Sequence, residues 1–390
     1  MPKFDDLSRS LAAFDQDSTL VAAIELSQSS WLVGGLVPGV AREPLKKLAP
    51  DASGVLALLE QWRGEAVRAG RRILRICVAY EAGRDGFWLA RWLRGRGIEC
   101  HVIHPTSVSV SREHRRAKTD RLDVGLLKRA LLGWLRGEAG HCRMVAVPTR
   151  EEEDGKRPLR EREALVKEGT RLVNRMKSLL ALHGITGFNV KLKKARERLG
   201  GLVTAEGEPL PPQTLAELDR ALERRGLIKA QIAAIDAAAA ARLEAAPDIG
   251  VHPMILILAR VIGVGVSTAE QLVREVLSRH LRDGRAVGRY VGLTGSPDES
   301  GARRREQGLA KAGNGRIRRT MLQLAWRFLV HQPDSALAQW YRRRTADGRA
   351  VTKKTMIVAL ARKLLIALWE LATTGKVPEG VRLHPEPVQA

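Results

Sequence analysis

The sequence predicts an α/β domain followed by two all-α regions. Short apolar runs alternate with helical patterns up to about residue 104, a charged, proline-bounded run follows later, and beyond it the periodicity is helical. A chain of 390 residues is long enough for two or three domains with buried cores. We expect domains at 18–147, 159–246 and 247–375, a linker at 148–158 and a loose, proline-rich tail at 376–390.

The first domain is predicted to contain a mixed sheet. An apolar strand over 20–26 is followed, after a serine-rich turn, by a hairpin partner over 31–37. Helical patterns then alternate with buried strands, which is typical of parallel pairing. In chain order these are a helix over 53–69 with Ser53 as its N-cap, a strand over 72–80, a helix over 84–96 and a strand over 98–103.

The rest of the chain is predicted to be helical. Apolar residues at helical spacing indicate long helices over 159–183 and 213–243, an antiparallel hairpin or coiled coil serving as a spacer or as an oligomerisation arm. Two helices around Gly263 and Gly265 suggest a helix-hairpin-helix, whose glycine turn either holds a phosphate or is only structural. Further helices are expected over 316–330 and 353–373.

Charge favours a nucleic-acid partner. The chain has 66 Lys and Arg against 43 Asp and Glu, a net charge of +23, which disfavours an enzyme of small metabolites. An apolar content of 44% argues against a disordered basic tail. Three scattered cysteines, Cys77, Cys100 and Cys142, fit small buried residues in a reducing compartment. With no signal peptide or membrane-spanning run in the sequence, we expect a cytoplasmic protein, at the bacterial nucleoid when active.

Four acidic residues form the first candidate site. Glu25 interrupts an apolar strand, Glu81 follows a second strand, and Asp120 and Asp123 share one face of a helix predicted to run to about residue 136. A buried carboxylate in mid-strand needs a partner, and Mg²⁺ or Mn²⁺ would supply one. The alternatives are a solvated loop acid at Glu81 and acids that favour the helix dipole at Asp120 and Asp123. The order of the acids is that of ribonuclease-H-like nucleases.

A serine among basic residues forms the second candidate site. Ser300 precedes a glycine and is followed by a run of cations, which can stabilise charge on a phosphoryl transition state. Ser296 lies close by, and on chemistry alone a loop that grips phosphates is the commoner case. We expect nucleic-acid contacts from Lys118, Arg121, Gly263, Gly265, Arg303, Arg304, Arg305, Lys311, Asn314, Arg316, Arg318 and Arg319.

From about residue 20 to 344 the chain resembles the DEDD-type serine transposases of insertion-sequence family 110, which are RNA-guided recombinases. The motifs that carry the resemblance are Ile24-Glu25-Leu26-Ser27, Tyr80-Glu81-Ala82, Lys118-Thr119-Asp120-Arg121-Leu122-Asp123, a helix from Leu165 to Ile185, and a C-terminal series of Gly-x-Gly at 263, Gly-Leu-Thr at 292, Ser-Gly at 300, Lys-x-Gly-Asn at 311 and Arg-Arg at 318. One departure is Glu25, where the family usually has Asp.

The resemblance implies a RuvC-like N-terminal domain, a helical coiled-coil arm for dimerisation and a helical C-terminal transposase domain. It implies catalysis by Ser300 through a covalent phosphoserine, assisted by Mg²⁺ on Glu25, Glu81, Asp120 and Asp123. It also implies donor and target DNA chosen by base pairing to a structured bridge RNA. Dimers would pair into a tetramer in which the acidic site of one subunit faces the serine of another.

Two alternatives remain open. A metal-dependent nuclease of the Holliday-junction type would use the four carboxylates without the serine. A non-catalytic nucleic-acid-binding protein would use the arginines alone to hold phosphates. Neither requires both signatures in one chain.

Overall fold

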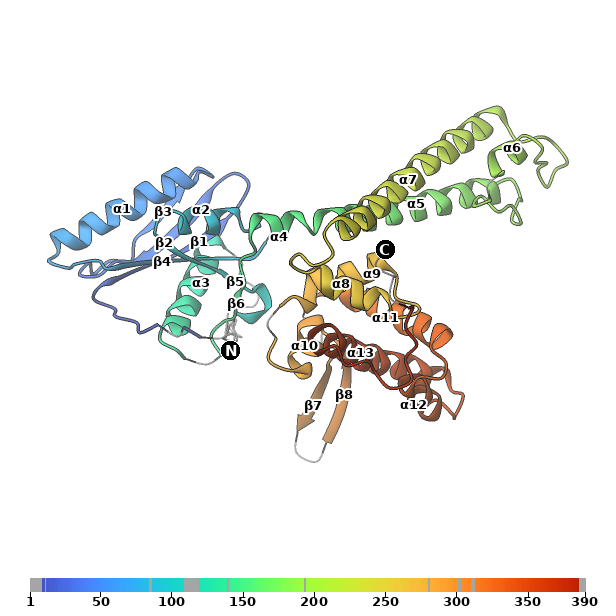
Figure 1. Ribbon diagram of the computed structural model, residues 1–390. Coiled ribbons are helices and arrows are strands. Elements are labelled where there is room, and N and C mark those ends of the chain that lie inside the picture. The colour runs from blue at the N-terminus through green and yellow to red at the C-terminus, as the bar shows by residue number, and fades with distance from the viewer. Residues whose placement is uncertain are drawn as a thin grey trace. The chain divides into compact units, whose positions relative to one another are not determined.

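The computed structural model describes residues 9–10, 12–83, 86–108, 119–138, 140–192, 194–279, 281–300, 303–309 and 313–385. The chain divides into two compact units, Met1–Glu151 and Glu152–Ala390, which are described one at a time (Figure 1). Within the described ranges, no helix combines the length and apolar character needed to cross a membrane.

The first unit contains a six-stranded mixed sheet in the order β3-β2-β1-β4-β5-β6. The pairs β1–β4 and β4–β5 are parallel, and the other neighbours are antiparallel, which confirms the predicted hairpin and the parallel strands after it. The edge strands β3 and β6 were not predicted, because one carries two lysines and the other has two residues. The strands are β1 (Thr19–Leu26), β2 (Trp31–Leu36), β3 (Leu45–Leu48), β4 (Arg75–Glu81), β5 (Glu99–Ile103) and β6 (Met144–Val145).

Helices cover both faces of this sheet (Figure 1). Even-numbered residues of β1 and β4, such as Ile24 and Tyr80, are buried on the face covered by α1 and α2. Odd-numbered residues, such as Ala23 and Ala79, are buried on the opposite face under α3. Successive side chains of a strand point to opposite faces, so each helical layer receives one of the two sets. The helices are α1 (Ala52–Arg68), α2 (Trp88–Arg94), the 3₁₀ turn η1 (Pro105–Ser107) and α3 (Asp120–Leu135).

The N-cap predicted for the first helix is wrong by two residues. Asp51 caps α1, and its carboxylate accepts hydrogen bonds from the backbone N–H groups of Ser53 (3.1 Å) and Gly54 (2.8 Å). Aspartate and serine are comparable N-caps, so composition did not distinguish them.

The three cysteines are buried and unpaired, as the sequence predicts. Burial raises the pKa of the Cys100 thiol to about 12 and that of Cys142 to about 11. Thiols with such pKa values are protonated at neutral pH and are poor nucleophiles. They therefore serve as small core side chains.

The second unit begins with a helical arm made of two long antiparallel helices (Figure 1). Ion pairs join Arg162 to Asp236 and Arg175 to Glu217. A later residue of the first helix thus pairs with an earlier residue of the second, which means that the two helices run antiparallel. This confirms the predicted hairpin, whereas the expected linker 148–158 is largely helical. The arm and the turn before it contain α4 (Arg150–Asp154), α5 (Arg157–Ala181), α6 (Ala195–Leu199) and α7 (Pro212–Ala245).

The remainder of the second unit is a helical domain around α13, with a β-hairpin attached. Leu364, Leu365 and Leu368 of α13 lie in one apolar core with residues of the surrounding helices. The paired helices around Gly263 are confirmed, and so are α11 and α13. The elements are α8 (His252–Ala259), α9 (Val266–Leu272), the π-helical turn η3 (Val273–Leu277), α10 (Gly284–Val291), β7 (Gly295–Ser300), β8 (Arg303–Leu309), α11 (Gly315–His331), α12 (Ala336–Arg344) and α13 (Ala350–Thr374).

The C-terminal segment expected to be loose is bound to this domain as far as His384. The buried Gln332 donates from Nε2 to the carbonyls of Ile262 and Arg382 (both 2.8 Å) and accepts from the Arg382 N–H (2.9 Å). Val261 and Leu383 form an antiparallel bridge. Prolines in this segment prevent helix formation but do not prevent docking. Residues 386–390 lie outside the described residues.

We expect Gln332→Ala to release this segment, because three backbone groups lose a buried hydrogen bond. Such losses cost about 2 kcal/mol, which corresponds to about 30-fold faster amide exchange at Arg382 and Leu383. Hydrogen–deuterium exchange measures this. Gln323→Ala, an exposed change on the same helix, should leave exchange unchanged. Unchanged protection in Gln332→Ala would contradict the assigned role.

Candidate active site

Glu25 and Glu81 lie at neighbouring positions of two parallel strands. The pairing of β1 with β4 runs as far as Ile24 opposite Tyr80, and the two glutamates come next on their strands. By the alternation of side chains, they belong to the face covered by α3, as Ala23 and Ala79 do. The carboxyl ends of parallel strands are where ligands of open α/β sheets bind.

The other two acids stand in the first turn of α3. Thr119 caps this helix, and its hydroxyl accepts from the Leu122 N–H (3.3 Å). Asp120 and Asp123 follow, three residues apart and therefore on one helical face. Acidic residues in a first turn are also favoured by the helix dipole, so the position stabilises both carboxylates.

A close approach at Gly34 brings the start of α3 towards Glu25. A Cβ atom on Gly34 would lie 2.5 Å from Cγ1 of Val124, the residue after Asp123. Gly34 belongs to β2, and two residues before it Leu32 stands opposite Glu25 in the β1–β2 ladder. A larger residue at 34 would push the helix away from the sheet. The glycine thus permits the first turn of α3 to approach the part of the sheet that holds Glu25.

The exposure of the acids corrects one expectation. Glu25 is the second-last residue of β1 and is half-buried rather than buried in mid-strand, because the strand ends at Leu26. Asp123 is also half-buried, and Glu81 and Asp120 are exposed. No three of these acids have carboxylate oxygens within 4.8 Å of one another. The described residues therefore place the four acids on one face without forming a closed ligand cage.

One other group of ligand-type side chains is compact but already occupied. Cys77, Glu99 and His101 have ligand atoms within 4.8 Å of one another. The Glu99 carboxylate accepts two hydrogen bonds from Arg75 (2.6 and 2.8 Å) and one contact from His101 Nε2 (2.6 Å). Burial raises the pKa of Glu99, but the hydrogen bonds from His101 and Arg75 outweigh it and hold that pKa at about 2. Because Arg75 already neutralises the carboxylate, the cluster is an ion-pair network between β4 and β5 rather than a metal centre. No sequence motif predicts this network.

Ser300 is the last residue of β7 and stands next to the turn of the β7–β8 hairpin. Its ladder partner is Arg303, and Glu299 and Asp298 pair with Arg304 and Arg305. The sequence did not predict this hairpin, because its strands lack apolar alternation. The backbone thus places three arginines on the strand beside the serine.

The base of this hairpin is fixed at Gly313 and Asn314. A Cβ atom on Gly313 would lie 2.6 Å from the Tyr290 carbonyl oxygen, which accepts from the Asn314 N–H at 2.9 Å. The Asn314 side chain caps α11 by accepting from the N–H groups of Arg316 and Ile317. Its Nδ2 points at Glu275 Oε2 (3.5 Å). Asn314, expected to contact nucleic acid, thus has both ends of its amide engaged inside the protein.

Several cations expected to grip phosphates also have internal partners. Glu163 of α5 pairs with Arg316 (2.8 Å) and Arg319 (3.2 Å), and Arg318 donates to the Gly292 carbonyl (3.5 Å). These bonds join α11 to the arm and to the end of α10.

The two glycines expected to contact nucleic acid lie in the turn between α8 and α9. Gly263 has a positive φ of 97°, and its carbonyl accepts a hydrogen bond from Arg327. Gly265 immediately precedes α9.

The remaining candidate contacts differ in what the structure describes. Arg121 is exposed on α3. Lys118 and Lys311 lie outside the described residues.

The chain is similar to transposases over most of its length. Residues 256–342, which include Gly263 and Ser300, match the transposase family described as IS116/IS110/IS902. A relative from Sinorhizobium fredii, named "Putative transposase y4rJ", is 43% identical over 371 residues, which cover 93% of this chain and 93% of the relative. A second relative from the same organism, named "Putative transposase y4qE", is 23% identical over 76% of this chain and 75% of its own length.

The resemblance noted from the sequence motifs is therefore confirmed at the level of the family. This chain belongs to the IS116/IS110/IS902 family of transposases, which break and rejoin DNA in transposition.

Proposed function

We propose that the protein is a recombinase that uses Ser300 as its nucleophile, is assisted by Mg²⁺ or Mn²⁺ on Glu25, Glu81, Asp120 and Asp123, and is guided by a structured RNA. The observation that carries the proposal is that Glu25 and Glu81 lie at the ends of adjacent parallel strands, on the face covered by α3, and that the first turn of α3 carries Asp120 and Asp123. Carboxylate oxygens are the ligands that Mg²⁺ prefers in proteins.

The proposed first domain is RuvC-like, that is, ribonuclease-H-like. An antiparallel group β3-β2-β1 followed by the parallel strands β4 and β5, with helices on both faces, supports this proposal. Its donor set of carboxylates, two of them exposed, suits a hard cation that keeps several waters. A bound Mg²⁺ would stabilise negative charge on the reacting phosphodiester. Glu25 is one methylene longer than aspartate, so a bound metal would sit slightly differently or its first ligand would be weaker.

The proposed chemistry at Ser300 is a transesterification. The Ser300 oxygen loses its proton and bonds to the phosphorus of a DNA phosphodiester, while the bond from phosphorus to the leaving deoxyribose oxygen breaks and that oxygen takes up a proton. Attack by the hydroxyl of another strand reverses these changes and releases the serine. No nucleotide hydrolysis is needed, because the covalent ester conserves the bond. Arg303, Arg304 and Arg305 on the adjacent strand would stabilise the negative charge.

The two candidate sites belong to different compact units of one chain. We propose that the acidic site of one subunit acts with the serine of another, in dimers that pair into a tetramer, with the α5–α7 arm as the dimer contact. The alternatives make different demands. A metal nuclease does not need Ser300, and a non-catalytic binding protein needs neither site.

Guidance by RNA is supported by composition. Only 4% of the residues are aromatic, which leaves few side chains for stacking on bases, whereas cations that contact phosphates are abundant. A protein that recognises the backbone can leave sequence recognition to a paired RNA.

We expect Ser300→Ala to abolish a covalent protein–DNA adduct while DNA binding is retained, because only the nucleophilic oxygen is removed. Denaturing gel electrophoresis with labelled DNA measures the adduct. Ser296→Ala is the matched control and should form the adduct normally. An adduct that persists in Ser300→Ala would exclude this serine as the nucleophile.

We expect Asp123→Asn to lower strand exchange by about a hundredfold or more, because a carboxylate that would hold the cation is lost. The same variant should need more Mg²⁺ for half-maximal activity and should bind DNA normally. Asp248→Asn, an exposed change far along the chain, is the control. Full recombination by Asp123→Asn would show that the acidic face has another role.

We expect one discrete structured RNA to copurify with the protein when the gene is expressed with its native flanking DNA. Sequencing of the bound nucleic acid at moderate salt tests this. A heterogeneous mixture, or no RNA, would argue against guidance and favour general phosphate binding.

A further inference from the structure

Besides the arginines next to Ser300, the helical domain of the second unit carries another basic surface. It consists of the end of α12, the loop after it and the start of α13, and its cations are Arg342, Arg343, Arg344, Arg349, Lys353 and Lys354. We propose that this α12–α13 surface binds the phosphodiester backbone of nucleic acid, separately from the serine hairpin. The proposal requires nucleic-acid binding by the protein but no particular catalytic residue.

The surface is almost uniformly positive. Six of the thirteen positions from 342 to 354 are Arg or Lys, and each of the six is exposed. The single acid among them, Asp347, accepts from the Arg349 N–H (3.2 Å) and from the Thr352 hydroxyl (2.6 Å). Its carboxylate is therefore hydrogen-bonded to the loop backbone and to a side chain at the start of α13.

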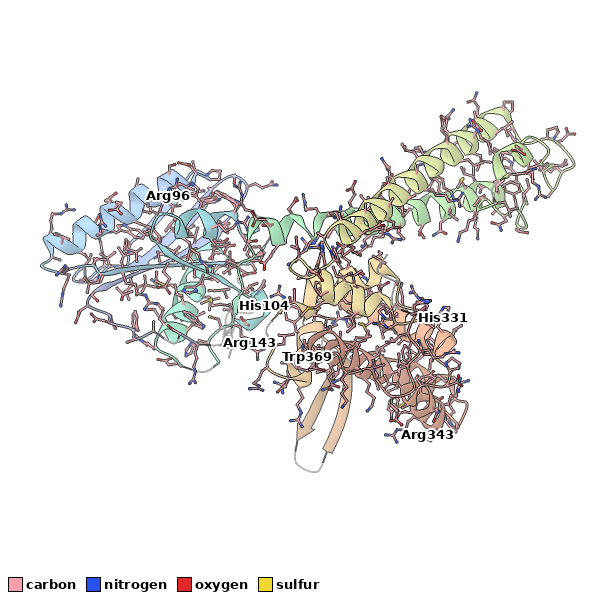
Figure 2. The ribbon with its side chains drawn as sticks, in the orientation of Figure 1. Arg96, His104, Arg143, His331, Arg343 and Trp369 are labelled. Carbon is pink, nitrogen blue, oxygen red and sulfur yellow. The ribbon has the colours of Figure 1, made fainter. Side chains whose placement is uncertain are left out.

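These cations differ from the other arginines of the same unit. Arg160, Arg316 and Arg319 pair with carboxylates of Glu275 and Glu163. In the described part of the chain, none of the six cations has a carboxylate within ion-pair distance, and Arg342 donates to the Pro333 carbonyl (2.9 Å). Figure 2 shows Arg343 projecting outward from α12, away from the core of its unit. The cations predicted from the sequence to hold phosphates are thus partly neutralised, whereas these are available.

The helix dipole explains only half of this arrangement. Arg342, Arg343 and Arg344 occupy the last turn of α12, where cations are favoured. Arg349 is the N-cap residue of α13, and Lys353 and Lys354 follow close to the same N-terminal end, where the dipole disfavours cations. Charges placed against this local preference are expected where a negatively charged partner compensates for them.

The loop between the two helices holds the cations in fixed positions. Tyr341 is buried, its ring contacts that of Trp326 edge-on at 6.3 Å, and its hydroxyl donates to the Lys353 carbonyl (3.5 Å). The Thr345 hydroxyl donates to the Tyr341 carbonyl (2.9 Å). The end of α12 and the start of α13 are therefore tied to each other and to α11. Preorganised cations lose less entropy when they bind a phosphate backbone.

The test replaces three of these cations and measures the salt dependence of binding. The variant carries Arg343→Gln, Arg344→Gln and Lys353→Gln, in a Ser300→Ala background so that binding is independent of catalysis. The probes are a 20-base-pair DNA duplex and an RNA hairpin, titrated between about 50 and 300 mM KCl. Each lost phosphate contact lowers the slope of log K against log salt by about 0.9 on duplex DNA.

We expect the slope to fall by about 2–3 and the affinity at 0.1 M salt to fall at least about tenfold, for one probe or both. A change with DNA alone assigns the surface to DNA, a change with RNA alone assigns it to RNA, and a change with both assigns it to phosphates in general. Unchanged slopes for both probes would overturn the proposal.

A control separates this surface from net charge. Arg68→Gln, Arg72→Gln and Lys46→Gln remove the same charges from exposed positions of the first unit. An equal loss of slope in the control would also overturn the proposal. Because the Ser300→Ala background forms no adduct under the proposed mechanism, failure of the serine assignment is seen in the adduct assay and failure of this surface in the salt slopes.

Discussion

The parallel pairing of β1 with β4 is the constraint on which the acidic site depends. It fixes Ile24 opposite Tyr80, and the next residue on each strand is a glutamate. A shift of one residue in either strand would move one glutamate to the other face of the sheet, among the apolar side chains under α1 and α2. The buried residues Ala23 and Ala79 prevent that shift, because a shifted strand would turn its apolar set away from α3. The core thus sets the position of the acids.

In the second unit, two acidic residues organise the arginines. Glu163 pairs with Arg316 and Arg319, and the nearly buried Glu275 contacts Arg160 and Asn314. Because Arg160 and Arg319 remain 40% and 62% exposed, solvent screens these pairs, and they fix the position of the side chains more than they add stability. These contacts connect the arm to the start of α11, directly after the serine hairpin. They give the base of the hairpin a defined position in a strongly basic protein.

A net charge of +23 does not show which cations meet nucleic acid. Arginines close to Ser300 in sequence, such as Arg316 and Arg319, are used for internal contacts. Those at the end of α12 face solvent without carboxylate partners in the described residues. The distinction depends on which acids fold beside them, so a charge pattern along the chain could not reveal it.

The sequence by itself determined the order of the main helices and strands, and it predicted the acidic set. Continuous apolar runs identify β1, β4 and β5, because these strands are buried on both faces. An apolar period of 3.6 identifies α5 and α7, because burial of one face of a helix imposes that period. The β7–β8 hairpin, the edge strands and the docked C-terminal segment were decided by tertiary structure. Their residues lack an apolar period, and hydrogen bonds from the Gln332 side chain to backbone carbonyls hold the C-terminal segment in place. The approach of α3 to Glu25 also required the fold, because it depends on a glycine on β2 meeting Val124, a contact between residues ninety positions apart.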